Sequence, residues 1–229
     1  MKRYSVIIIL SFLMLNSASA KLRNGYEQGS QSTREMLRNY NFILSGNNNL
    51  SPSDKRRINN TIKDLMALQF YYELTEELLK QFKRISPDIY NRVDSIRDAK
   101  GRVTDVYVKF IPREEALIMA GGVTRVSSSD DDEDACYSEY GKHTVSIKVW
   151  IFNKALFALA HELGHVSYQV PNHEAYTDYY KKVYRPYATD SNHMGHAGTD
   201  GSGKSAFAFE KEFTREYRKY LRYGNPHMP

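Results

Sequence analysis

The sequence has one cysteine, Cys136, and one tryptophan in 229 residues, and it has no strong excess of charge of either sign. A single cysteine forms no intramolecular disulfide, so the fold must be stabilised by packing or by a bound group. The formal net charge of +5 is too small to indicate a protein that binds nucleic acid. Apart from its first twenty residues, the chain also lacks an apolar run that approaches membrane-spanning length.

The first twenty residues have the layout of a secretory signal peptide. Lys2 and Arg3 precede an apolar run from Val6 to Leu15, and small residues follow up to Ala20. This order predicts cleavage after Ala20. The apolar run is too short for a membrane span, and Lys21 stands where a lipoprotein would need a cysteine. We therefore expect a secreted or periplasmic protein with no membrane span.

The rest of the chain divides into a polar leader and one larger domain. Residues 21–50 contain few apolar side chains, which predicts a mobile leader with one or two helical turns. Ser51-Pro52-Ser53-Asp54 then has the N-cap serine, the first-turn proline and the acid that begin a helix. Apolar residues at helical spacing extend that helix to about Lys83. We expect the domain to cover residues 51–229.

Three later stretches have the composition or alternation of β-strands: residues 105–111, 123–126 and 144–152. The last alternates most regularly, with valine and isoleucine on one face. An almost uncharged helix is predicted from Ala155 to Val166, and an amphipathic helix from Ser205 to Tyr223. Helices and strands in one domain of this size predict an α+β fold.

Residues 160–166, Ala-His-Glu-Leu-Gly-His-Val, contain the most informative motif of the chain. Residues four apart share a face of a helix, so His161 and His165 can bind one zinc ion. A catalytic zinc takes three protein ligands and a water, whose pKa falls to about 7. Glu162, beside the first histidine, can accept a proton from that water. The motif therefore predicts hydrolysis of a peptide bond.

The pattern is unusual enough to need an explanation other than chance. In a chain with 7 histidines, a random H-E-x-x-H has a probability of roughly one in a hundred. The surrounding helix is predicted to be buried, where each polar side chain costs a few kcal/mol unless it is paired. A metal ion is one such partner. The alternative is a hydrogen-bonded cluster of histidine and glutamate without metal.

This segment resembles the active-site helix of the zincin metallopeptidases, including its apolar lead-in and its Leu163-Gly164 pair. The resemblance implies a small mixed sheet, a buried active-site helix and a C-terminal helical lobe. It also implies an edge strand that binds the substrate as a further antiparallel strand, for which residues 123–126 are our candidate. Tyr168 and Pro171 depart from the metzincin pattern, so the third zinc ligand must come from elsewhere.

Glu210 is our candidate for the third ligand. It falls within the apolar stripe of the predicted last helix, whereas Glu212 and Glu216 do not. A carboxylate on a buried face needs a strong partner, and zinc supplies one. The arrangement resembles the glutamate helix of the gluzincin branch, although Glu210 lies farther from His165 than in thermolysin-like members. The alternatives are a lysine or arginine partner for Glu210, or a ligand from among His173, His193 and His196.

Three other segments have more than one interpretation. His196 could donate a hydrogen bond to an oxyanion, or it could be a surface histidine. The acidic run 130–134 is expected to be a solvated loop, with calcium or basic peptides as alternative partners. Residues 198–205 match the phosphate-binding pattern G-x-x-x-x-G-K-[ST], but polar residues precede them where that loop needs a buried strand. We favour a glycine turn capped by Asp200 or Ser202.

The sequence thus predicts a secreted zinc metallopeptidase with His161, His165 and Glu210 as ligands and Glu162 as general base. Its partner would be a peptide or protein substrate. The alternative from another class is a catalytically inactive, zinc-stabilised extracellular protein that serves as a binding module or scaffold.

Overall fold

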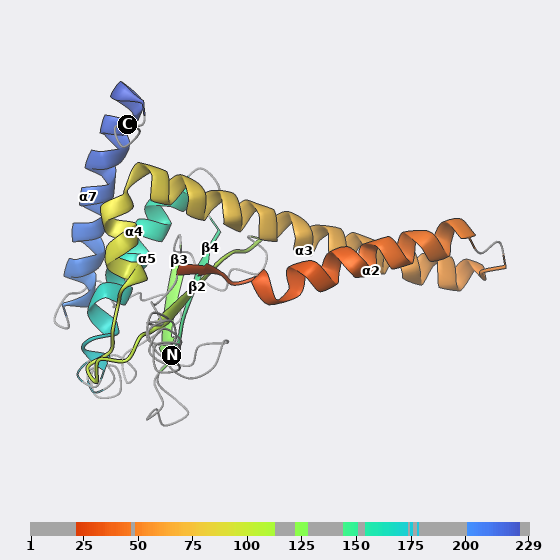
Figure 1. The fold of residues 1–229 in the computed structure, drawn as a ribbon, viewed down its shortest axis with the longest axis horizontal. Coiled ribbons are helices and arrows are strands. Elements are labelled where there is room, and N and C mark those ends of the chain that lie inside the picture. Colours follow the sequence, from red (N-terminus) through yellow and green to blue (C-terminus); the bar gives the residue numbers. More distant parts are fainter. Residues whose placement is uncertain are drawn as a thin grey trace, which may run out of the picture.

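The computed structural model describes residues 22–46, 49–112, 122–127, 144–150, 154–173, 175, 178 and 201–224. Its elements are, in chain order, β1 (Leu22–Asn24), α2 (Glu27–Gly46), α3 (Pro52–Ile85), α4 (Pro87–Asp94), β2 (Asp105–Phe110), β3 (Gly122–Ser127), β4 (Thr144–Val149), α5 (Ala155–Gln169) and α7 (Ser202–Tyr223). Helices α4, α5 and α7 gather at one end of the molecule, and α2 and α3 extend away from it as a pair (Figure 1). This mixture of helices and sheet confirms the α+β prediction at the coarse level.

The strands form one small mixed sheet in the order β1-β2-β4-β3. β1, β2 and β4 are parallel, and β3 pairs antiparallel with β4. All three predicted strands are present within two or three residues of their expected bounds. The strand predicted from residues 123–126 therefore lies at an edge of the described sheet, as we expected.

One apolar core joins the sheet to α3, α4, α5 and α7. In β4, Val145, Ser146 and Ile147 are all buried, so both faces of this central strand are covered. Phe213 of α7 is fully buried and stacks on Phe82 of α3, with ring centroids 4.9 Å apart. The largest fully buried side chains include Phe82, Ile89, Val106, Ile147, Leu159, Leu163 and Phe213.

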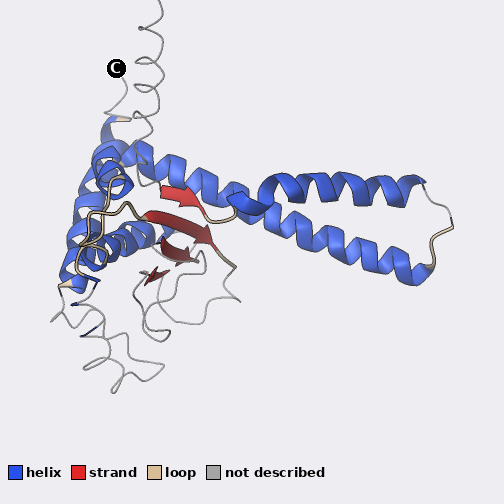
Figure 2. Ribbon diagram, turned by 60° about the horizontal axis from the view of Figure 1, so that its bottom comes forward, coloured by secondary structure: helices blue, strands red, loops and turns tan. Residues whose placement is uncertain are grey.

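Helix α3 begins where the sequence predicted. The backbone N–H of Asp54 donates to the Ser51 hydroxyl at 3.1 Å, and Pro52 occupies the first turn. The buried side chains of α3 all lie in its second half, from Thr75 to Ile85, where the helix packs on the core. Its first half lies beside α2 in the extended hairpin (Figure 2).

Thr75 links α3 to the sheet through a buried hydrogen bond. Its hydroxyl accepts from the backbone N–H of Phe110 at 2.9 Å and donates to Tyr71 O at 2.8 Å. We expect Thr75→Val to lower the free energy of unfolding by about 1–3 kcal/mol, because the Phe110 N–H loses the hydroxyl acceptor that Thr75 provides. Urea titration followed by circular dichroism measures this change. Thr61→Val is the matched control, since Thr61 bonds only the Arg57 carbonyl one turn earlier. Equal stability of the two variants would contradict the prediction.

The prediction that residues 21–50 form a mobile leader with one or two helical turns is corrected by the structure. These residues form a strand that pairs with β2 and a helix from Glu27 to Gly46, rather than one or two helical turns. Asn24 is buried and its side chain donates to Tyr72 O at 2.9 Å and to Glu76 Oε1 at 3.1 Å. Residues 22–24 thus belong to the sheet, so the domain does not begin at residue 51. The helix was missed because it packs mainly on α3 and exposes large side chains such as Phe42, at 76%.

Several features of the sequence analysis fall outside the described residues: the signal peptide 1–20, the acidic run 130–134 and Cys136. In the part of the chain that the structure describes, no helix combines the length and apolar character needed to cross a bilayer.

Candidate metal and catalytic site

Helix α5 carries the H-E-x-x-H motif through the centre of the core. Its buried residues cover most of its circumference, in agreement with its uncharged composition: Ala155, Leu159, Ala160, Glu162, Leu163, Gly164, His165, Val166 and Gln169. The side with Phe157, His161 and Tyr168 is partly buried. The sheet and α4 contact it, and α7 packs along it. The motif is therefore held on a helix that is fixed by its neighbours.

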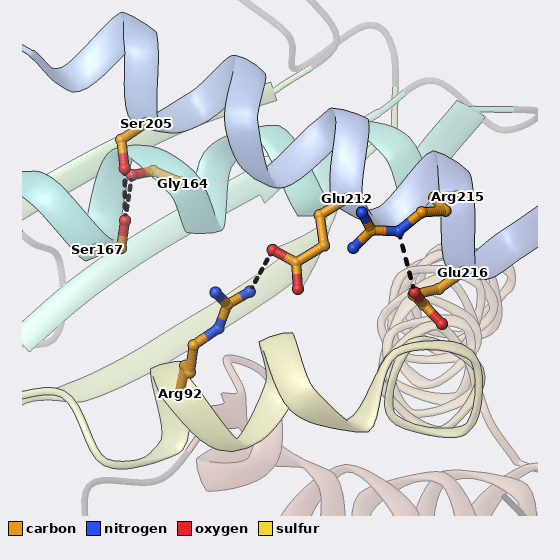
Figure 3. A network of polar contacts seen from close by, with 7 residues as sticks. All are labelled: Arg92, Gly164, Ser167, Ser205, Glu212, Arg215 and Glu216. Carbon is orange, nitrogen blue, oxygen red and sulfur yellow. Dashed lines mark hydrogen bonds and ion pairs between the residues drawn. The ribbon is translucent and has the colours of Figure 1, made fainter.

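Gly164 allows α7 to approach α5 at backbone distance. A Cβ atom at this position would lie 2.5 Å from Ala206 Cα and 2.6 Å from the Ser205 carbonyl oxygen. Beside this contact, the Ser167 hydroxyl donates to Gly164 O at 2.8 Å and lies 2.8 Å from the Ser205 hydroxyl (Figure 3). Small and hydroxyl-bearing residues thus set how the two helices meet.

A second contact between α7 and a neighbouring helix is a part-exposed ion pair. Arg92 of α4 donates to Glu212 at 2.7 Å (Figure 3). Glu216 contacts Arg215 at 3.4 Å and Lys219 at 3.2 Å on its own helix. Both of these glutamates therefore have cationic partners outside the motif, which leaves Glu210 as the α7 carboxylate available to α5.

Glu210 does lie against the motif. Its Oε2 is 3.1 Å from His161 Nδ1, and its side chain is 41% exposed against 15% for His161. The rings of His161 and His165 have centroids 5.0 Å apart and are inclined by 75°. The two imidazoles share a face of α5, and the carboxylate reaches the first of them from a different helix. Burial did not decide this placement, because the side chains of Glu212 and Glu216 are only 27% and 18% exposed and are thus more buried than that of Glu210.

These distances can be compared with those a zinc ion needs. At ordinary zinc–ligand distances, two ligand atoms of a tetrahedral site lie about 3.3–3.5 Å apart, and two ligating imidazole centroids about 5 Å apart. The spacings of 3.1 Å and 5.0 Å are close to these values. The types of donor also fit, since two histidines and a carboxylate are a known catalytic set. The donor types therefore fit the ion, and so do the spacings of two of the three pairs, His161 with Glu210 and His161 with His165.

The side chains of His161, His165 and Glu210 do not converge on one point in this structure. Among the described residues, no group of three or more histidine, cysteine, aspartate or glutamate side chains has the arrangement of a metal site. The contact between His161 and Glu210 is also an ordinary hydrogen bond between imidazole and carboxylate. This is the metal-free cluster that the sequence left open, so the two interpretations must be separated by experiment.

Glu162 points to the edge strand β3. Only 6% of the residue is exposed, and its Oε2 accepts a hydrogen bond from the Thr124 hydroxyl at 2.6 Å. Burial raises the pKa of Glu162 to about 7, and the Thr124 bond opposes part of that rise. Sequence reasoning missed Thr124, because strand alternation alone does not tell which side chain of a short edge strand faces the helix.

The remaining predicted residues are distributed as follows. His193 and His196 lie outside the described residues, so the oxyanion role of His196 stays a prediction. Helix α7 begins at Ser202, earlier than predicted, with Gly201 as its N-cap at φ +83° and no side-chain cap. Ser202 is therefore not the cap, and Asp200, the other predicted cap, lies outside the described residues. The Ser205 hydroxyl, which a phosphate-binding loop would direct to a metal-bound nucleotide, instead contacts Ser167.

Comparison of the chain with protein-family models, with curated proteins and with solved structures finds no match in any of the three.

Proposed function

We propose that this chain is a zinc-dependent peptidase of zincin type, in which His161, His165 and Glu210 hold the metal. The observation that supports this most is the 3.1 Å separation between His161 Nδ1 and Glu210 Oε2, which joins residues from two helices. The antiparallel edge strand β3 beside α5 agrees with the fold that the motif implies.

Each residue of the site would have a separate role in hydrolysis. When bound, the zinc ion would polarise the scissile carbonyl and make a nearby water more acidic. Glu162 would accept a proton from the attacking water at its carboxylate and pass it to the nitrogen of the leaving amine. Thr124 would hold that carboxylate in position through its 2.6 Å hydrogen bond. Water and the peptide are thereby converted into a carboxylate and an amine.

Strand β3 would align the substrate. It pairs with β4 on one side and is an edge of the sheet formed by the described strands. An edge strand presents unpaired backbone groups that an extended peptide can bind as a further strand. Since Thr124 of the same strand contacts Glu162, a peptide aligned there would pass close to the general base.

We also propose that the protein works outside the cytoplasm, because residues 1–20 have the order of a signal peptide. A second candidate function is a zinc-stabilised binding protein without turnover. The exposed apolar side chains of the α2–α3 hairpin, among them Phe42 and Met66, favour it.

Zinc binding by Glu210 is tested first. We expect about one zinc ion per chain in the purified protein, as measured by plasma mass spectrometry. Glu210→Gln should lower zinc affinity by more than about 100-fold, because an amide is a much weaker ligand than a carboxylate. Competition with a chromogenic chelator measures this affinity.

Glu212→Gln is the matched control for that measurement. It removes a carboxylate from the same helix, but one that is paired with Arg92 instead of facing His161. Its zinc affinity should equal that of the unmodified protein. Equal affinities for Glu210→Gln and Glu212→Gln would exclude Glu210 as a ligand. A folded protein that holds no zinc at all would refute the peptidase proposal.

A further inference from the structure

Helix α7 carries a row of cationic side chains on the side away from the core. Ala206, Phe209 and Phe213 of the helix are buried against the rest of the molecule. Exposed lysines and arginines recur at spacings of three and four residues, which places them along one side of the helix. We call this row the α7 cationic face: Lys211, Arg215, Arg218, Lys219 and Arg222.

The acidic residues of α7 offset only part of this charge. Glu216 contacts Arg215 at 3.4 Å and Lys219 at 3.2 Å, while Glu212 is paired with Arg92 of α4. Lys211 and Arg218 have no acidic partner in the described part of the chain. Cations that lack partners on a solvent-exposed face favour an anionic ligand.

A pocket lies along this face. Its lining in the described part of the chain belongs entirely to α7 and runs from Phe207 and Glu210 to Arg222 and Tyr223. Because Glu210 is both a lining residue and the neighbour of His161, a molecule in the pocket would reach the place where hydrolysis is proposed.

The length of the face indicates the size of the ligand. From Lys211 to Arg222 the helix rises about 16 Å at 1.5 Å per residue. An extended peptide covers that distance with about five residues. The face therefore fits a short acidic stretch of a polypeptide better than a single small anion.

We propose that the α7 cationic face binds acidic residues of the polypeptide substrate and so selects substrates with a cluster of aspartate or glutamate near the cleaved bond. This inference rests on the proposed peptidase function, because only a peptidase would treat the bound polypeptide as a substrate. Binding of the polypeptide to the α7 cationic face does not itself depend on turnover. A polypeptide is favoured over a nucleic acid or an anionic membrane because Glu210, which contacts His161, lines the same pocket as the cationic residues.

The test measures binding in the Glu162→Gln background, where a bound peptide is not cleaved. The probes are a fluorescein-labelled peptide with about five consecutive glutamates, the same peptide with glutamines, and a single-stranded oligonucleotide of equal charge. Fluorescence anisotropy at low salt should show that the glutamate peptide binds at least about tenfold more tightly than the glutamine peptide.

The variant Lys211→Ala/Arg218→Ala should lose about tenfold in affinity for the glutamate peptide. The matched control is Arg56→Ala/Arg57→Ala, which removes two exposed cations from α3 and should bind as before. Equal binding by both double variants, or equal binding of glutamate and glutamine peptides, would overturn the proposal. The oligonucleotide could instead bind more tightly than the glutamate peptide and lose this binding in the α7 variant. That result would overturn the proposal in favour of a nucleic-acid ligand.

Cleavage by the zinc-loaded protein with Glu162 intact separates this inference from the proposed function. If the glutamate peptide binds but no peptide of a library is cleaved, the peptidase proposal fails and the binding face stands. If peptides are cleaved, and the α7 double variant has the same kcat/KM as the unmodified protein for both acidic and neutral sequences, the proposed function stands and this inference fails.

Discussion

Glu162→Gln is expected to lower kcat for peptide hydrolysis by about 10³-fold while the zinc content and the fold stay the same. The amide has nearly the same shape as the carboxylate, and its oxygen can still accept the hydrogen bond that Thr124 donates at 2.6 Å. It does not accept a proton from water, so general-base catalysis is lost. Steady-state kinetics on a quenched fluorescent peptide library measure the change.

Two measurements accompany this result. Zinc content by plasma mass spectrometry should be equal in Glu162→Gln and the unmodified protein, because Glu162 is directed to Thr124 and not to the histidines. Glu212→Gln, which removes a carboxylate paired with Arg92, should keep kcat within about twofold. Full activity of Glu162→Gln would contradict the proposed role of Glu162. Absence of activity in every form, with zinc bound, would favour the binding-protein candidate.

Gly164→Ala is expected to lower the free energy of unfolding by about 3 kcal/mol or more. The new methyl group would lie 2.5 Å from Ala206 Cα and 2.8 Å from Ala206 N, and backbone atoms of a packed helix do not move aside as a flexible side chain does. Helix α7 would therefore be pushed away from α5. Urea titration monitored by circular dichroism measures the loss of stability.

The same substitution should weaken zinc binding, because a shift of α7 moves Glu210 away from His161. Gly46→Ala is the control, since a Cβ at Gly46 meets nothing within 4 Å. That change should leave stability within about 0.5 kcal/mol. If Gly164→Ala were as stable as Gly46→Ala, the close approach of α5 and α7 in this structure would be wrong.

Features that depend on neighbouring residues were predictable from the sequence. The start of α3 follows from Ser51 and Pro52, whose hydroxyl and ring act within one turn. Strand β2 follows from apolar residues at every second position, because one of its faces is buried. The helical period was a poorer guide to burial in α7: Glu210 was placed in the apolar stripe, but at 41% its side chain is more exposed than those of Glu212 and Glu216.

Features that depend on distant residues were decided by the tertiary structure. His161 and Glu210 are 49 positions apart, and they meet because Gly164 lets α7 pack at backbone distance on α5. Thr124 reaches Glu162 from a strand 38 positions away. Strand β1 and helix α2 also required the fold, since β1 has only three residues and α2 packs mainly on α3 rather than on the core. Local patterns thus determined the candidate residues, and long-range packing decided which of them lie together.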